Sequence, residues 1–218
     1  EATIDTGNHP PIAKRNYRFN PQEKCIVRQQ IRDMEDAGII RQSDSPWSAP
    51  IFLVDKRPPA SPGNSVGVAK RMVADMRYLN SVATMTHWPI PTLEHCVDVI
   101  SEARPTFFAC LDQKCGYYNV KIRESDQEKT GFSSPDGVHY VFTRLPMGYT
   151  NAVHWFQRLI CRVLAGLDPT VALIYVDDCL ILGRTEVELL KNLETVFGRF
   201  RQGNIRLFGA KCHFGVRS

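Results

Sequence analysis

The spacing of apolar residues along the chain predicts four helices. Apolar positions recur every three to four residues over 21–38, 93–103, 151–165 and 185–203. Asn20 and Thr92 are suited to cap the first two helices, and Thr185 with Glu188 forms a capping box for the last. The apolar face predicted for the last helix consists of Val187, Leu190, Leu193, Phe197 and Phe200.

Shorter apolar runs predict strands. They cover 51–54, 71–76, 106–111, 171–176 and 179–182, and a hairpin is predicted from 130–133 and 139–143. The first twenty residues have no hydrophobic period and contain Pro10 and Pro11, which predicts an extended arm. Strands and helices do not alternate steadily, so we expect an α+β fold with an antiparallel sheet.

Three acidic residues stand next to the most apolar of these runs. Asp112 ends the run 106–111, and Asp177 with Asp178 forms a predicted two-residue turn between 171–176 and 179–182. An Asp pair in a turn often serves only the turn itself, because Asp side chains accept hydrogen bonds from the nearby backbone. Here the apolar runs on both sides indicate that the acids are buried. Carboxylates that lie close together repel one another, so they need a cation between them. If the runs share one sheet, the three acids could hold two Mg²⁺ or Mn²⁺ ions for phosphoryl transfer.

Composition limits the other possibilities. The chain of 218 residues is 43% hydrophobic and 23% charged, which is typical of a folded protein with one core or two small subdomains. The net charge of +4 says little by itself about a nucleic-acid partner. Seven cysteines without a C-x-x-C pair favour reduced thiols in an intracellular compartment, and no apolar run is long enough to cross a membrane.

Several motifs resemble those of reverse transcriptases. Residues 175–178 match the Tyr-x-Asp-Asp box of these enzymes, and 111–117 resemble the Leu-Asp-Leu-Lys-Ser-Gly-Tyr segment of gypsy-class LTR retrotransposons. Further matches follow in the family's order, at 38–41, 45–50, 77–80, 88–91, 129–132, 145–148, 151–152 and 156–157. The resemblance covers about residues 5 to 215.

The resemblance implies a right-hand polymerase with fingers at 1–84 and 120–151 and a palm at 85–119 and 152–218. The expected function is RNA- or DNA-templated DNA synthesis from dNTPs on a primer. We expect a piece of a longer polyprotein without thumb or RNase H, in the cytoplasm or a virus-like particle. The alternatives are a fragment that binds template and primer without turnover, a structural protein of retroelement descent, and a templated RNA polymerase.

The resemblance also implies roles for individual residues. Asp112 and Asp177 would coordinate two Mg²⁺ ions, with Asp178 completing the site and the backbone carbonyl of Gln113 adding a ligand. Tyr117 would be the steric gate that excludes a 2′-hydroxyl; the alternative is a packed core tyrosine.

Other positions match the family's nucleotide-binding set. Lys56 would contact the incoming triphosphate, as would either Lys70, where the family usually has arginine, or Arg71 one place along. Both lysines could instead be ordinary exposed charges. Met147 replaces the family's glutamine or aromatic residue, which favours apolar packing over a nucleotide contact, and Gln157 completes the set.

Overall fold

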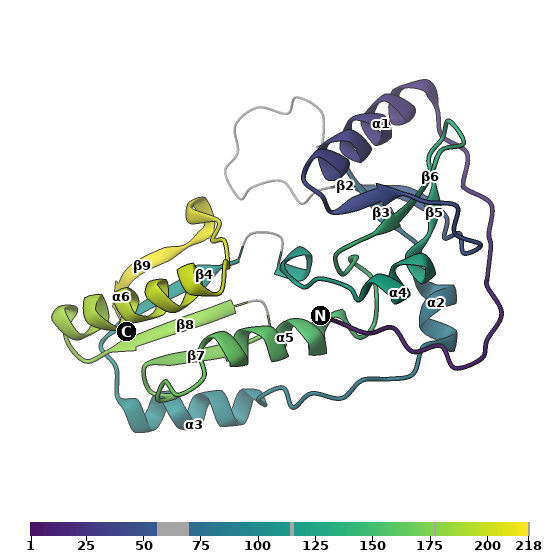
Figure 1. The fold of residues 1–218 in the computed structure, drawn as a ribbon. Coiled ribbons are helices and arrows are strands. Elements are labelled where there is room, and N and C mark those ends of the chain that lie inside the picture. The colour runs from purple at the N-terminus through teal and green to yellow at the C-terminus, as the bar shows by residue number, and fades with distance from the viewer. Residues whose placement is uncertain (56–69, 114–115, 177, 218) are drawn as a thin grey trace. The chain divides into compact units, whose positions relative to one another are not determined.

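The protein divides into two compact units. The computed structural model describes residues 1–55, 70–113, 116–176 and 178–217 (Figure 1). Unit 1 comprises Glu1–Met85 and Lys121–Ala152, and unit 2 comprises Thr86–Val120 and Val153–Ser218. Helices and antiparallel sheets occur in both, as the α+β expectation requires. Within the described ranges, no helix has the length and apolar character needed to cross a membrane.

Unit 1 contains two small sheets. One has the strand order β1 (Ile40–Gln42), β6 (His139–Phe142), β5 (Phe132–Ser133), and the other pairs β2 (Ile51–Asp55) with β3 (Lys70–Ala74). The helices are α1 (Pro21–Asp36), α2 (Arg77–Val82) and α4 (Glu124–Gln127), and the 3-10 turn η2 (Glu128–Thr130) follows α4. The Asn20 cap of α1 is confirmed: its side chain accepts from the Glu23 amide, and the Glu23 carboxylate accepts from the Asn20 amide.

The N-terminal segment is extended, but it is part of the core of unit 1. Ala2 and Ile4 are 0% exposed. Ala2 forms a parallel bridge with Ile122, and the Ile4 amide donates to Asp126. The sequence predicted an extended arm but not its burial, because two apolar residues are too few to form a recognisable period.

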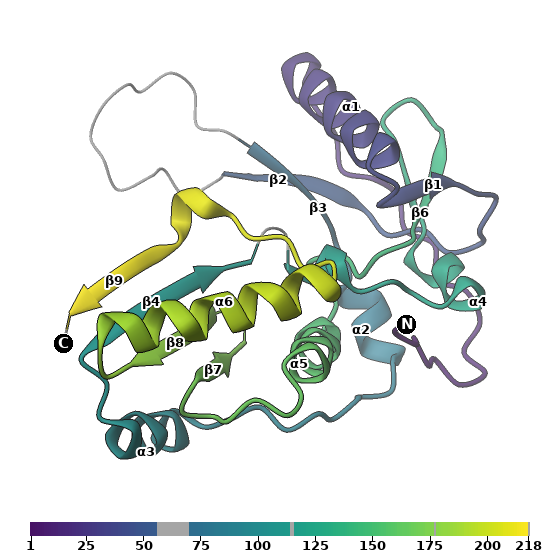
Figure 2. The same cartoon turned by 60° about the vertical axis from the view of Figure 1, so that its left-hand side comes forward.

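Unit 2 is built on a four-stranded antiparallel sheet in the order β7 (Ala172–Tyr175), β8 (Asp178–Gly183), β4 (Phe107–Asp112), β9 (His213–Arg217). Its helices are α3 (Leu93–Ala103), α5 (Ala152–Val163) and α6 (Glu186–Gln202), and its 3-10 turns are η1 (Gly116–Asn119) and η3 (Gly209–Lys211). Helix α6 lies along β8 and β4 (Figure 2). Strands β1 and β9 and helix α2 were not predicted, because each is short and lacks a complete hydrophobic period.

Side chains alternate between the two faces of the sheet along β4 and β8. Ala109 and Leu111 are 0% exposed, as are Cys179 and Ile181 opposite them. Asp112 and Asp178 fall on the other face because successive side chains alternate across a strand. The core of unit 2 therefore fixes the direction in which both acids point.

The buried face of α6 differs from the predicted one. Leu189, Leu193, Val196 and Phe200 are buried, whereas Val187 is 77% and Leu190 65% exposed. The helix has enough apolar residues for two overlapping faces, and packing on the sheet selects one of them. The Thr185 cap is confirmed by its hydrogen bond from the Glu188 amide.

Candidate active site

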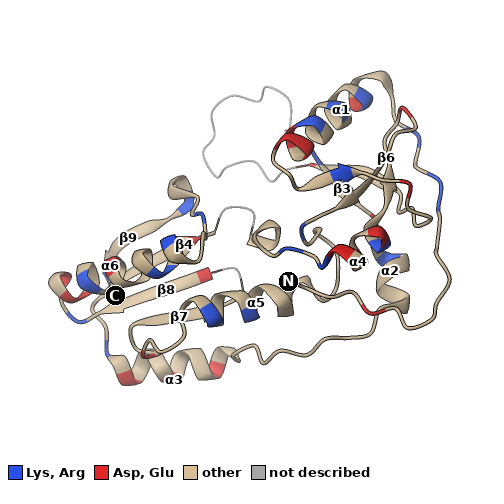
Figure 3. Cartoon of the chain, in the orientation of Figure 1, with Lys and Arg blue, Asp and Glu red and all other residues tan. Residues whose placement is uncertain are grey.

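Two of the three predicted acids stand side by side. Asp112 is the last residue of β4 and pairs directly with Asp178, the first residue of β8. Such cross-strand partners have Cβ atoms about 4.5–5.5 Å apart and point to the same face. The end of β8 that carries Asp178 is drawn red in Figure 3. Asp177 lies outside the described residues.

The turn before Asp178 has an unusual backbone. Tyr175 pairs with Asp178, so Asp178 belongs to strand β8 rather than to the predicted acidic turn. Val176 has φ +54°, in the left-handed region that β-branched residues rarely adopt. Such strain persists only where the surroundings enforce it, and it concentrates at functional sites.

Lys211 of η3 is a basic neighbour that the sequence analysis missed. Its Nζ lies 3.7 Å from Oδ2 of Asp112. The segment that carries it is anchored to the same strand end, because the Phe208 amide donates to the Asp112 carbonyl at 2.9 Å. No local pattern links Lys211 to Asp112, since the contact depends on how the C-terminal segment folds back.

The donor set at this strand end suits a hard divalent cation. Carboxylate oxygens are the ligands that Mg²⁺ prefers. Within the described ranges no three His, Cys, Asp or Glu side chains group closely enough to hold a metal ion. The facing carboxylates of Asp112 and Asp178 supply two of the three acids that the sequence pattern calls for.

Tyr117 follows this strand end on η1. Its ring packs edge-on against Phe156, with the ring centroids 5.8 Å apart and the planes at 79°. Phe156 is 0% exposed, and a Cβ added to Gly116 would come within 3.1 Å of its ring. Tyr117 itself is half-buried.

The two glutamines of the predicted set are interior residues. Gln113 is 6% exposed, and no partner for its side-chain nitrogen or oxygen occurs among the described residues. Gln157 on α5 is 1% exposed and lines a cavity with α3 and β7. Only the backbone of Gln113 remains available as the predicted metal ligand.

Lys70 and Arg71, two of the residues predicted to bind phosphate, point to opposite faces of the β2–β3 hairpin. Lys70 forms an ion pair with Glu23 of α1, with Nζ and Oε1 3.1 Å apart. Arg71 is exposed on the other face, where its Nη1 lies 3.4 Å from Sδ of Met147. Lys56 lies outside the described residues. The structure therefore brings Arg71 and Met147 together and places Lys70 against α1.

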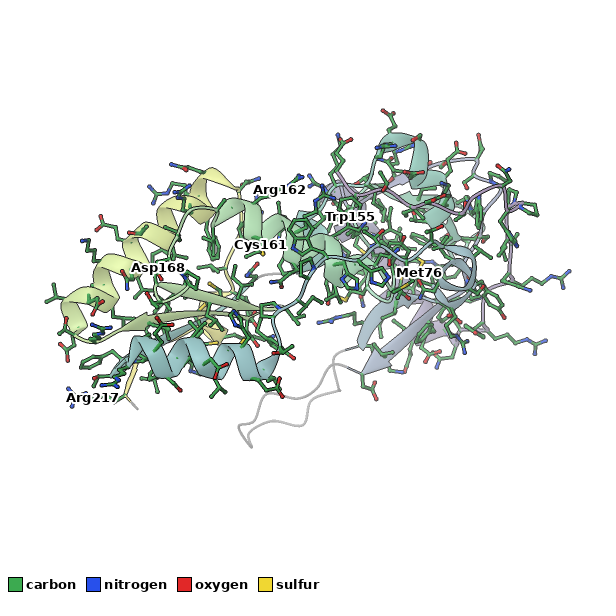
Figure 4. All side chains as sticks on the ribbon, turned by 90° about the horizontal axis from the view of Figure 1, so that it is seen from below. Met76, Trp155, Cys161, Arg162, Asp168 and Arg217 are labelled. Atoms are coloured by element: carbon green, nitrogen blue, oxygen red, sulfur yellow. The ribbon has the colours of Figure 1, made fainter. Side chains whose placement is uncertain are left out.

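The hairpin face that carries Arg71 continues into a cavity of about 610 Å³ within unit 1. Tyr17, Phe52 and Arg77 line it, as does Met76, labelled in Figure 4. Tyr17 and Phe52 pack edge-on, with ring centroids 6.3 Å apart. Asp75, 5% exposed, accepts hydrogen bonds from Arg77 and Tyr17, and the Arg77 guanidinium lowers its pKa from 3.8 to about 2.

Comparisons with known proteins agree on one family. Residues 66–218 match the family model described as reverse transcriptase (RNA-dependent DNA polymerase). The chain is 33% identical over 204 residues to the retrovirus-related Pol polyprotein from transposon 412 of Drosophila melanogaster, covering 94% of this chain and 16% of that protein. It is 33% identical over 213 residues to the Pol polyprotein from transposon gypsy of the same fly, covering 98% and 20%.

Solved structures show the same fold. The protease-reverse transcriptase of prototype foamy virus superimposes with a TM-score of 0.84 at 25% identity, over 98% of this chain and 27% of that one. The foamy viral enzyme in complex with an RNA/DNA hybrid superimposes with a TM-score of 0.81 at 25% identity, over 97% and 27%. The chain thus spans about a fifth of the curated relatives' length and about a quarter of these solved chains. By sequence and by fold, it belongs to the reverse transcriptase family.

Proposed function

We propose that this chain is the fingers and palm of an RNA- and DNA-templated DNA polymerase. In this proposal unit 1 is the fingers, expected at 1–84 and 120–151, and unit 2 is the palm, expected at 85–119 and 152–218. The observation that carries the proposal is the direct pairing of Asp112 on β4 with Asp178 on β8, beside the strained backbone at Val176. Because the chain belongs to the reverse transcriptase family, we interpret this pair as part of a metal-binding site for nucleotide transfer.

Asp112, Asp177 and Asp178 would hold two Mg²⁺ ions, or Mn²⁺ ions, with the Gln113 carbonyl as a further ligand. When bound, such ions activate the primer 3′-hydroxyl and stabilise the leaving oxygen. The protein's part is to hold the acids at one strand end. Lys211 balances the charge of Asp112 and must share that carboxylate with any cation that binds there.

Among the unit 1 cations, Arg71 is the better candidate for the dNTP phosphates. Its guanidinium is exposed, and its fork suits phosphate geometry. The charge of Lys70 is already balanced by Glu23. Met147 would then support Arg71 through its sulfur rather than contact the nucleotide itself.

Tyr117 would discriminate against ribonucleotides. Its edge-on contact with the fully buried Phe156 would hold the ring in place, so that the ring meets the sugar of a dNTP in a fixed position. A gate must be rigid, because a ring that could swing away would admit a 2′-hydroxyl at little cost.

The template would lie on the exposed face of β2 and β3. Aromatic rings beside cations suit single-stranded nucleic acid, because bases stack on the rings and phosphates pair with the charges. Tyr17, Phe52, Arg71 and Arg77 give this face that character. The remaining partners would be the primer and the rest of the polyprotein, in the cytoplasm or a virus-like particle.

Primer extension on RNA and DNA templates tests the proposal. Asp112→Asn should abolish Mg²⁺-dependent dNTP incorporation, while Asp98→Asn, an exposed change on α3, should not. Incorporation that survives Asp112→Asn combined with Asp178→Asn would refute the polymerase assignment. If the unaltered chain binds template–primer but extends it only as part of a longer polyprotein, it is the binding fragment; if it binds no template–primer, the structural alternative is favoured.

A further inference from the structure

A lysine side chain lies against one of the two facing carboxylates of unit 2. The Nζ of Lys211 is 3.7 Å from Oδ2 of Asp112, and Asp112 pairs across the sheet with Asp178. Two facing carboxylates repel each other, and a cation beside them reduces this repulsion. Lys211 therefore supplies positive charge at a carboxylate that the proposed metal site uses.

The ion pair is not needed to anchor the segment that carries Lys211. The segment between α6 and β9 runs past the end of β4 (Figure 2), where the Phe208 amide donates to the Asp112 carbonyl at 2.9 Å. Leu207 and Gln113 form an antiparallel bridge next to this hydrogen bond. The Lys211 amide donates to the Phe208 carbonyl at 2.8 Å, which closes the turn. Because these backbone contacts already fix the segment, the charge of the Lys211 side chain acts on the carboxylate rather than on the fold.

The ion pair can open without moving the backbone. The Lys211 side chain is 63% exposed, and its distance from Asp112 is longer than the roughly 2.7–2.9 Å of a charged hydrogen bond. The same ammonium lies 5.5 Å from the centre of the Phe208 ring, whose face attracts a cation. The ammonium therefore keeps a favourable contact when it releases the carboxylate.

We propose that Lys211 is a positioning residue of the metal site. Its ammonium occupies the Asp112 carboxylate until a divalent cation binds, then releases that oxygen and stays over the Phe208 ring. Lys211 thereby lowers the affinity of the site for the cation, because the ammonium gives up Asp112 and then lies close to a second positive charge. The inference rests on the proposed function, since it requires that Asp112 and Asp178 bind a divalent cation.

Mn²⁺ binding to the whole chain, followed by electron paramagnetic resonance at near-physiological salt, tests the inference without a polymerase assay. Lys211→Met removes the charge at similar length and should bind Mn²⁺ about threefold to fivefold more tightly, a small factor because water screens the pair. Lys211→Arg keeps the charge and should bind Mn²⁺ as the unaltered chain does. Unchanged or weaker binding by Lys211→Met overturns the inference.

Lys191→Met on α6 is the matched control, because it removes the same charge from an exposed position of unit 2. The next residue, Asn192, donates to the carbonyl of Leu182, which lies well along β8 from Asp178. At the rise of a strand this separation is about 13 Å, beyond the screening length of about 8 Å at physiological salt. Lys191→Met should therefore leave the affinity for Mn²⁺ unchanged.

Asp112→Asn separates this inference from the proposed function. If the unaltered chain binds no Mn²⁺, or if Asp112→Asn binds it equally well, the proposed metal site fails and the inference fails with it. Binding that depends on Asp112 but not on Lys211 refutes only the inference.

Nuclear magnetic resonance of lysines labelled at the ε-carbon detects the release of Lys211 without comparing affinities. The signal of Lys211 is the one that is missing in Lys211→Arg. Mg²⁺ should shift this signal in the unaltered chain and leave that of Lys191 in place. Binding of Mg²⁺ that does not shift the Lys211 signal shows that the ion pair stays closed, which overturns the inference.

Discussion

Replacing Asp75 by Asn should remove a pH-dependent part of the stability of unit 1. The Asp75 side chain is 4% exposed and pairs with Arg77 at 2.6 Å, which lowers its pKa from 3.8 to about 2. A pKa lowered by folding means that the fold favours the charged form. This contribution is therefore fully present above about pH 4 and is lost as the pH falls toward 2.

The size of the effect follows from the shift in pKa. A difference of about 2 units corresponds to roughly 2 to 3 kcal/mol, and we expect the lower end because the Arg77 side chain is 76% exposed and water screens the pair. Asp75→Asn keeps the shape and removes the charge. It should cost about 2 kcal/mol at pH 7 and under about 0.5 kcal/mol at pH 2.

Urea unfolding of the protein and its variant between pH 7 and pH 2, followed by circular dichroism, measures this difference directly. Asp136→Asn is the matched control, because Asp136 also pairs with an arginine, Arg28, but the two side chains are 43% and 46% exposed. The control should have a much smaller effect throughout. A loss for Asp75→Asn that is the same at pH 7 and pH 2 would show that packing, not charge, holds the pair together.

Three further predictions concern activity and backbone geometry. Tyr117→Ala should raise ribonucleotide incorporation at least about tenfold while Tyr117→Phe does not, measured by primer extension; equal discrimination in both would mean that Tyr117 is only a core residue. Gly131→Ala should unfold unit 1 or cost more than about 3 kcal/mol, because the new Cβ would lie 2.0 Å from the Trp47 carbonyl, whereas Gly198→Ala meets nothing within 4 Å and should stabilise α6 by about 0.5–1 kcal/mol in thermal melts. Val176→Asn should raise stability by about 1 kcal/mol, since Asn tolerates the left-handed backbone at φ +54°; a loss of stability would show that the Val176 side chain contributes more than its strain costs.

The sequence alone determined the local elements and the family. The Asn20, Thr92 and Thr185 caps mark three helix starts correctly, because capping depends on residues within one turn of each other. The apolar runs beside Asp112 and Asp178 likewise predicted strands, although Asp178 was expected in the turn, and the ordered motifs placed the chain among reverse transcriptases.

Tertiary structure decided whatever depends on distant partners. Alternation along β3 separates Lys70 from Arg71, but only the packing of α1 on one face leaves Arg71 exposed. The pairing of Asp112 with Asp178, the approach of Lys211 and the burial of Ile4 likewise join segments far apart in the chain. Local pattern carries no information about such contacts, because their energy arises only when the segments are brought together in three dimensions.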